Sequence, residues 1–211
     1  MWNMLHACGA IYGLYDGCMP IELASLLKSY RPSTTDGRLV KMTSTKGVTI
    51  IADYAHEKNS LRAVAKLGRS LVKRGGRLTG VVRLNHERPD DVLYHFGELA
   101  GDLFDDIVVY DKIDGYWRRA QETDMKRFPR EVGRTSLLVA EGASRTNKFV
   151  ERIVREDQAV AYAARHAKAG DVVVVIINDD VKRSLGFIKE NFSIEPVDHE
   201  RAVQDTERGG R

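Results

Sequence analysis

Four side chains that can do chemistry follow an apolar run in the stretch TIIADYAHEKNS, residues 49–60. Asp53, Tyr54, His56 and Glu57 bring two carboxyl groups, a phenol and an imidazole to the point where a buried strand turns toward a helix. An ionised acid is a pure hydrogen-bond acceptor for hydroxyl groups, and an imidazole changes its charge near neutral pH. The stretch is therefore a candidate binding or catalytic turn.

Each of these residues also has an ordinary structural interpretation. Asp53 can cap the turn that follows its strand, and His56 can be a partly buried histidine with satisfied hydrogen bonds. The sequence favours a ligand contact for Asp53 and leaves both interpretations open for His56. Arg38 can be a solvated charge, but its place after Gly37 and before a strand favours a contact with phosphate.

Further polar residues stand at the ends of other apolar runs. His86, Glu87 and Arg88 suggest acid-base work or a metal site, but a metal needs three or four converging ligands. We therefore interpret them as a polar loop over the sheet edge and predict no metal site. Asp111 ends DIVVYD and Asn178 follows VVVVII, so both are candidates for substrate contacts at strand ends.

Strands that alternate with helices position all of these residues. The hydrophobic pattern predicts strands at 38–44, 47–53, 77–84, 106–111 and 171–179, the first two joined by a tight turn at 45–47. It predicts helices at 61–74, 91–104, 135–143, 157–170 and 180–192, the first capped by Asn59 or Ser60. This order predicts an α/β, Rossmann-like fold, in which helices cover both faces of a mostly parallel sheet.

Composition sets outer limits on the protein. A chain of 211 residues buries one substantial core, and a net charge of +3, scattered among acids, does not favour nucleic acid as a partner. Cys8 and Cys18 are too few for a disulfide framework, which favours a cytoplasmic location. The apolar N-terminal stretch is too short to span a bilayer, so we expect no membrane segment. The sequence also predicts two short helices before a linker at 31–38, and a polar tail at the C-terminal end.

The motif DYAH, the Gly-Arg linker and the strand order resemble the C-terminal domain of the Mur ligases, which form amide bonds with ATP. The runs SYRP, GRLVKM, TIIADYAHEKNSLRAVAKL, GDLFDDIVVYDK and AGDVVVVIINDD are most similar to the cyanophycin synthetase branch. The resemblance implies a helical remnant of a central ligase domain at 1–31, a C-terminal-like domain at 32–197 and a tail at 198–211. It also implies an amino acid or an aspartyl peptide as substrate.

The resemblance assigns roles to individual positions. Arg38 would contact the ribose or phosphates of ATP, Asp53 the ribose hydroxyls, and Asn3 the adenine, while His56 would lie beside the nucleotide. Possible substrate contacts are Arg88, His86, Asp111 and Asn178. The chain departs from the family pattern in two loops, because Glu57-Lys58 replaces the usual Asn-Pro and NHERPDD keeps only one arginine of a Gly-Asp-Arg-Arg-like segment.

The phosphate-binding motif G-x-x-x-x-G-K-[ST] does not occur in the sequence. We therefore expect ATP and magnesium to be held through a P-loop ligase central domain or subunit, with the chain contributing the closing half of the site. One alternative is a stand-alone nucleotide- or amino-acid-binding regulatory module, and a third is a hydrolase that uses His56 or His86. The sequence leaves a homo-oligomer open.

Overall fold

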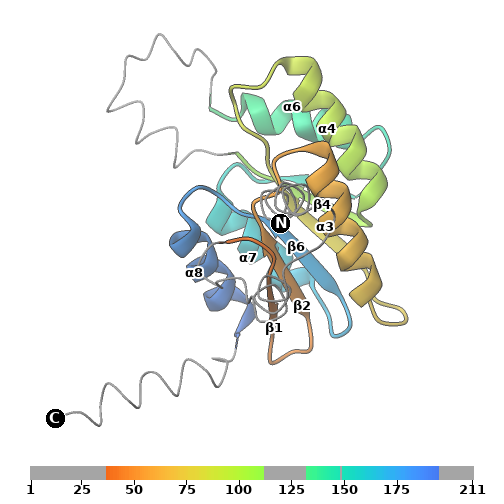
Figure 1. Ribbon diagram of the computed structural model, residues 1–211, viewed down its shortest axis with the longest axis vertical. Coiled ribbons are helices and arrows are strands. Elements are labelled where there is room, and N and C mark those ends of the chain that lie inside the picture. Colours follow the sequence, from red (N-terminus) through yellow and green to blue (C-terminus); the bar gives the residue numbers. More distant parts are fainter. Residues whose placement is uncertain (1–36, 112–131, 148, 195–211) are drawn as a thin grey trace, which may run out of the picture. The chain divides into compact units, whose positions relative to one another are not determined.

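The computed structural model describes residues 37–111, 132–147 and 149–194 (Figure 1). These residues belong to the compact unit Thr34–Arg211. Asn3, both N-terminal helices and the polar tail lie outside the described residues, as do the domain boundaries expected after residues 31 and 197, and all stay predictions. In the described ranges no helix has the length and apolar character needed to cross a membrane.

One six-stranded sheet forms the centre of the domain. Its strands run in the order β1-β2-β6-β3-β4-β5, and every neighbouring pair is parallel except β1 with β2. The tight turn predicted at 45–47 is present, and Gly47 has a φ of +79° there and donates its N–H to Ser44 O at 2.9 Å. The strands are β1 (Val40–Thr43), β2 (Thr49–Asp53), β3 (Leu78–Val82), β4 (Asp106–Val109), β5 (Val150–Arg152) and β6 (Val172–Ile176).

Helices cover both faces of this sheet, as predicted (Figure 1). The helices α3 (Lys58–Leu71), α4 (Asp90–Leu103) and α6 (Arg134–Ala143) pack on one face, and α7 (Glu156–His166) and α8 (Val181–Phe192) pack on the other. Because successive side chains of a strand point to opposite faces, an uninterrupted apolar run serves both cores. All five residues of β6 are buried and divide between the two clusters.

One local prediction was wrong, and one strand was missed. The N-cap of α3 is Glu57 rather than Asn59 or Ser60, because the backbone is extended at Glu57 (φ −137°, ψ 156°) and the helix begins at Lys58. Ser60 instead lies one turn inside, where its hydroxyl accepts the Glu57 N–H at 3.2 Å. The strand β5 was not predicted, because its three residues are at most half-buried and carry no apolar alternation.

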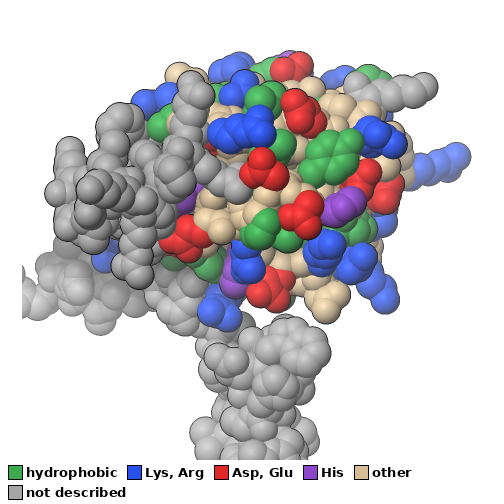
Figure 2. All heavy atoms as spheres, turned by 90° about the horizontal axis from the view of Figure 1, so that it is seen from above, with side chains coloured by type: hydrophobic (Ala, Val, Ile, Leu, Met, Phe, Trp, Pro, Cys, Tyr) green, Lys and Arg blue, Asp and Glu red, His purple; other side chains and the backbone are tan. Residues whose placement is uncertain are grey.

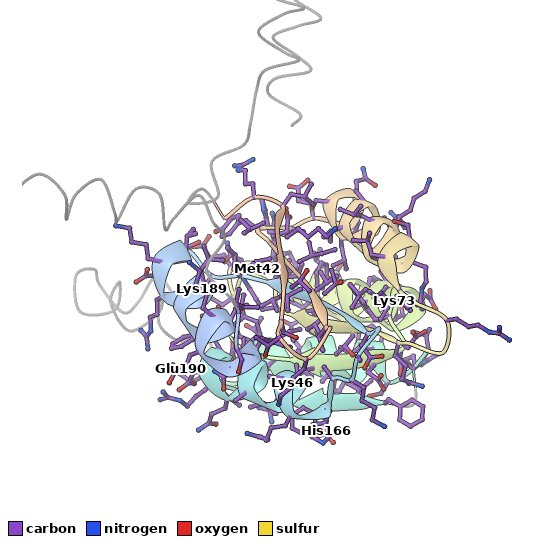
Figure 3. All side chains as sticks on the ribbon, turned by 90° about the horizontal axis from the view of Figure 1, so that it is seen from below. Met42, Lys46, Lys73, His166, Lys189 and Glu190 are labelled. Carbon is purple, nitrogen blue, oxygen red and sulfur yellow. The ribbon has the colours of Figure 1, made fainter. Side chains whose placement is uncertain are left out.

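The carboxyl ends and the amino ends of the parallel strands lie on opposite sides of the sheet and carry different residues. The carboxyl ends of the parallel strands lie together along one side of the sheet, which is called the carboxyl edge here. There β2 and β3 lead into α3 and α4 on one face of the sheet. The strand β6, which lies between them, leads into α8 on the other face. Such a topological switch point is where open α/β sheets bind ligands. Lys46, Lys73 and His166 precede β2, β3 and β6, and Figure 3 shows them at the opposite edge.

The exposed surface carries charges of both signs. Figure 2 shows Lys and Arg side chains interspersed with Asp and Glu over the described face seen from above, without a broad field of one sign. The described part of this face therefore lacks the continuous positive stripe that tracks a phosphate backbone.

Candidate functional site

Gly37 brings the chain to the switch point. Its φ is +63°, a left-handed conformation that favours glycine, and a Cβ there would lie 2.6 Å from Ile177 Cδ1 and 2.8 Å from Val181 Cγ1. Only the absence of a side chain lets the linker approach the end of β6 and the start of α8 this closely. Arg38 follows with its side chain exposed at the carboxyl edge.

Asp53 ends β2 beside the same linker. The register pairs Val40 with Ala52, so Leu39 lies opposite Asp53 and donates its N–H to Asp53 Oδ2 at 2.8 Å. Burial raises the pKa of Asp53 above 3.8, while the Leu39 N–H and the positive charge of Arg38 oppose that rise. The structure therefore brings the predicted acid and the predicted guanidinium together at one strand end.

His56 is oriented by the backbone that precedes it. Its Nδ1 lies 2.9 Å from Tyr54 O, and its ring centroid lies 5.3 Å from the Tyr54 ring. A carbonyl oxygen only accepts, so Nδ1 carries the proton of this hydrogen bond and the neutral ring keeps its lone pair on Nε2. His56 is half-buried, and this tautomer leaves Nε2 as the ring atom that can accept a proton.

Arg83 is the central residue that sequence reasoning missed. It follows β3, it is fully buried, and it donates from Nη2 and Nε to Ile177 O at 2.6 and 3.2 Å. Its Cζ lies 4.8 Å from the ring centroid of Tyr54, whose hydroxyl donates to Asp179 Oδ1. Burial and the Asp179 hydrogen bond raise the pKa of Tyr54. Arg83 thus links β3, the end of β6 and the DYAH turn.

A buried polar cluster continues from Arg83 toward α7 and α8. Tyr110 donates to Ile176 O at 2.6 Å and lies 3.3 Å from Glu156 Oε1, which also accepts from Ser184 Oγ at 2.5 Å. Asn178 Nδ2 lies 3.4 Å from Glu156 Oε2. Burial and the nearby Glu156 charge raise the pKa of Tyr110 well above 10.0, so its hydroxyl remains a donor.

The remaining predicted substrate contacts have different surroundings. Asp111 is buried after β4, and its Oδ2 accepts the Gly133 N–H at 2.6 Å, which fixes the start of α6. In the strand order, β6 and β3 separate β4 from β2, so the sheet does not bring Asp111 beside Asp53. His86 is buried in the loop after β3. The substrate roles of these residues stay predictions.

The two loops that depart from the family pattern contact each other. Arg88 Nη2 lies 3.8 Å from Glu57 Oε1; the Glu57 side chain is largely exposed and the Arg88 side chain is partly exposed. Glu57 therefore joins the turn after β2 to the loop after β3. Within the ranges that the structure describes, no three His, Cys, Asp or Glu residues form a group that could hold a metal ion.

Comparison with known proteins shows one family that the chain resembles over most of its length. The family model of the Mur ligase, glutamate ligase domain, matches residues 37–176. Cyanophycin synthetase of Trichormus variabilis is 29% identical over 172 residues, which cover 80% of this chain and 17% of that protein. The cyanophycin synthetase of Geminocystis herdmanii is 28% identical over 155 residues, covering 71% and 16%. The chain thus spans less than a fifth of the length of these relatives.

Two solved structures show the same fold. The MurF ligase from Thermotoga maritima in complex with ADP has a TM-score of 0.54 at 14% identity, with 87% of this chain and 36% of that chain covered. The UDP-N-acetylmuramate-alanine ligase MurC from the same organism has a TM-score of 0.55 at 12% identity, with the same coverage. At these identities the likeness concerns the fold alone.

Proposed function

Because this chain belongs to the Mur ligase family, as a glutamate ligase domain, we propose that its carboxyl sheet edge forms one wall of the ATP site of an amide-forming ligase. The other wall, with the P-loop and the magnesium ligands, belongs to a central ATP-binding domain or subunit. The ADP complex of the MurF ligase supports a nucleotide as the ligand.

The nearness of the Arg38 charge to Asp53 carries this proposal. Asp53 offers carboxylate oxygens as acceptors for ribose hydroxyls, and Arg38 offers a fork of N–H donors to phosphate oxygens. The Leu39 N–H holds Asp53 Oδ2 in place, and Gly37 sets the path of the chain that carries Arg38. A wall that is already ordered before the nucleotide binds loses less entropy on binding.

His56 adds a third contact beside the nucleotide. Its Nδ1 is held by Tyr54 O, so Nε2 is the atom that a ligand meets. The neutral ring accepts a proton or hydrogen bond at Nε2, and the protonated ring donates to a phosphate oxygen. The turn after β2 therefore offers an acid, a base and, through Arg38, a permanent cation to one ligand.

In a ligase of this type, ATP activates the acid substrate as an acyl phosphate, which an amine then attacks. The residues of this chain contribute by positioning the nucleotide and by neutralising charge, not by acting as the nucleophile. The amino substrate, an amino acid or an aspartyl peptide, is oriented by the neighbouring strand ends, where Arg88, His86 and Asn178 are the candidates.

A titration of the purified chain with ADP, followed by amide NMR shifts, tests the proposal. Arg38→Gln and Asp53→Asn each remove a charge, and loss of a charged hydrogen bond weakens binding by about 10-fold or more. Arg74→Gln and Asp102→Asn are matched controls, because both residues are exposed and lie outside the proposed site. Equal ADP affinity in all four variants would exclude this wall as the nucleotide site.

The second candidate is a stand-alone binding module that has lost the reaction. The contact between Glu57 and Arg88 favours it, since it joins the two loops that depart from the ligase pattern. Calorimetry with ATP, ADP, aspartate, arginine and short aspartyl peptides separates the two. Micromolar binding of aspartate, arginine or an aspartyl peptide by the chain alone supports the module. Weak ADP binding by the chain alone that becomes tight with a P-loop partner supports the ligase.

A further inference from the structure

The residues that connect β2 to α3 belong to neither element. Residues 54–56 follow the last residue of β2 and precede Glu57, the N-cap of α3. Neither the sheet ladder nor the helix therefore includes their backbone. Segments of this kind are more mobile than the elements they connect, unless their side chains are held by their surroundings. His56, the third contact of the proposed nucleotide wall, depends on such support.

The side chain of Tyr54 is held from two directions. Its ring lies over the buried Arg83 guanidinium, with 4.8 Å between the ring centroid and Arg83 Cζ. Its hydroxyl donates to Asp179 Oδ1, 125 residues further along the chain. A cation over an aromatic face and a hydrogen bond to a carboxylate both favour one orientation of the ring. The turn after β2 is thus tied to the loop after β6.

The position of Tyr54 determines the orientation of His56. His56 Nδ1 donates to Tyr54 O at 2.9 Å, and the centroids of the two rings lie 5.3 Å apart. The hydrogen bond at one ring nitrogen decides which nitrogen carries the proton. Movement of Tyr54 therefore moves the carbonyl group that orients His56, and it changes the ring atom that His56 presents to a ligand.

We propose that Asp179 is a positioning residue of the nucleotide wall, which acts through Tyr54 and keeps His56 Nε2 turned toward the nucleotide. This inference rests on the proposed function, because it concerns the contact that His56 makes with the nucleotide. Asp179 acts from the loop after β6, without contacting the ligand. Arg83 provides the buried surface against which the Tyr54 ring is held.

The charge of Asp179 alone predicts the opposite effect on binding. Asp179 is exposed and ADP is an anion, so a carboxylate at the same edge of the sheet repels the ligand. If Asp179 acted by its charge, its removal would strengthen ADP binding. If it positions Tyr54, its removal weakens ADP binding, because the hydroxyl loses this acceptor. The sign of the effect therefore separates the two roles.

The test combines ADP titrations of the purified chain with ¹⁵N NMR shifts of the histidine ring nitrogens. We expect Asp179→Ala and Tyr54→Phe each to weaken ADP binding by about 3- to 10-fold, the range of a single hydrogen bond. Both changes break the same bond, so the double variant should bind ADP no more weakly than either single variant. Asp179→Asn keeps an acceptor oxygen and should restore the affinity of the wild type.

The ring signals of His56 report its positioning directly, with or without bound ADP. In the neutral ring of the wild type the proton should reside on Nδ1, whereas in Asp179→Ala and Tyr54→Phe it should distribute over Nδ1 and Nε2. These two replacements lie at the surface or keep the buried ring, so the chain should fold in both.

Tyr162→Phe is the matched control. The Tyr162 hydroxyl also bonds a carboxylate, that of Glu151, and Nδ1 of His166 lies 2.8 Å from Tyr162 O. This tyrosine belongs to α7, whose last residue, His166, lies on the side of the sheet opposite the carboxyl edge (Figure 3). The control should therefore leave both the ADP affinity and the His56 signals unchanged.

Two results would overturn the proposal. One is an ADP affinity that rises or stays the same in Asp179→Ala, and the other is a set of His56 ring signals that match the wild type in both variants. Weaker ADP binding in Arg38→Gln and Asp53→Asn, with unchanged binding in Asp179→Ala, would reject this positioning role alone. Equal ADP affinity in all of these variants would reject the nucleotide wall as well.

Discussion

Replacing Gly37 with alanine tests how the linker reaches the site. An L-residue in the left-handed conformation costs about 1–2 kcal/mol, and forcing a methyl group into a packed region costs about 1–3 kcal/mol more. The Cβ of the variant would lie 2.6 Å from Ile177 Cδ1 and 2.8 Å from Val181 Cγ1, so both terms apply. We expect Gly37→Ala to lower the free energy of unfolding by about 3 kcal/mol, which is roughly 6–12 °C in melting temperature for a domain of this size.

Gly75→Ala is the matched control. Gly75 has a similar φ of +81°, but a Cβ there meets no atom within 4 Å. It therefore reports the conformational cost alone, about 1–2 kcal/mol. Melting temperatures from calorimetry and urea unfolding curves measure the two variants under the same conditions.

The two alanine variants should differ in ADP binding as well as in stability. Gly37→Ala displaces Arg38 from Asp53 and weakens ADP binding, whereas Gly75→Ala changes stability only. If both variants lose the same stability and keep the same ADP affinity, the linker does not pack against the end of β6 as described, and the reasoning fails.

Three further predictions concern stability. Because the pKa of Asp53 is raised on folding, the folded protein binds a proton at this carboxyl group more readily than the unfolded chain does. The free energy of unfolding therefore falls as the pH rises from 3.8 through the raised pKa. Urea unfolding should find Asp53→Asn more stable than wild type at pH 7, and this difference should vanish as the pH falls toward 3.8. Gly97→Ala should lower the unfolding free energy by about 3 kcal/mol in calorimetry, because its Cβ would lie 2.1 Å from Val139 O across the contact between α4 and α6. Arg69→Met should cost about 0.5–1 kcal/mol in urea unfolding, since it breaks a partly exposed two-point pair with Asp105 at 2.6 and 2.9 Å.

Periodicity and strand-end chemistry were enough to predict the main features of the fold. Apolar runs such as VVVVII identified the strands, and their alternation with helices identified the parallel sheet. The tight turn predicted between the first two strands places Arg38 near Asp53, because β1 runs antiparallel to β2 and therefore starts where β2 ends. The strands and the parallel sheet could be predicted because they depend on the local hydrophobic pattern and on how successive strands and helices connect.

Features that depend on tertiary contacts could not be predicted in the same way. Arg83 stands in RLTGVVRL, where an arginine at the end of a strand gives no sign that Tyr54 and Ile177 O will enclose it. The substrate role of Asp111 stays a prediction, and its sequence position gave no sign that its carboxylate would also accept the backbone N–H of Gly133, 22 residues away. The three residues of β5 form a strand because their backbone pairs with that of β4, and not because their sequence has the hydrophobic pattern of a strand.

The most direct measurement of the central claim is a map of the amide and side-chain NMR shifts that ADP induces in the isolated chain. The account predicts the largest shifts at Arg38, Leu39, Asp53 and His56, at the carboxyl edge of β2. Shifts confined to the opposite edge, around Lys46 and Lys73 (Figure 3), would contradict it.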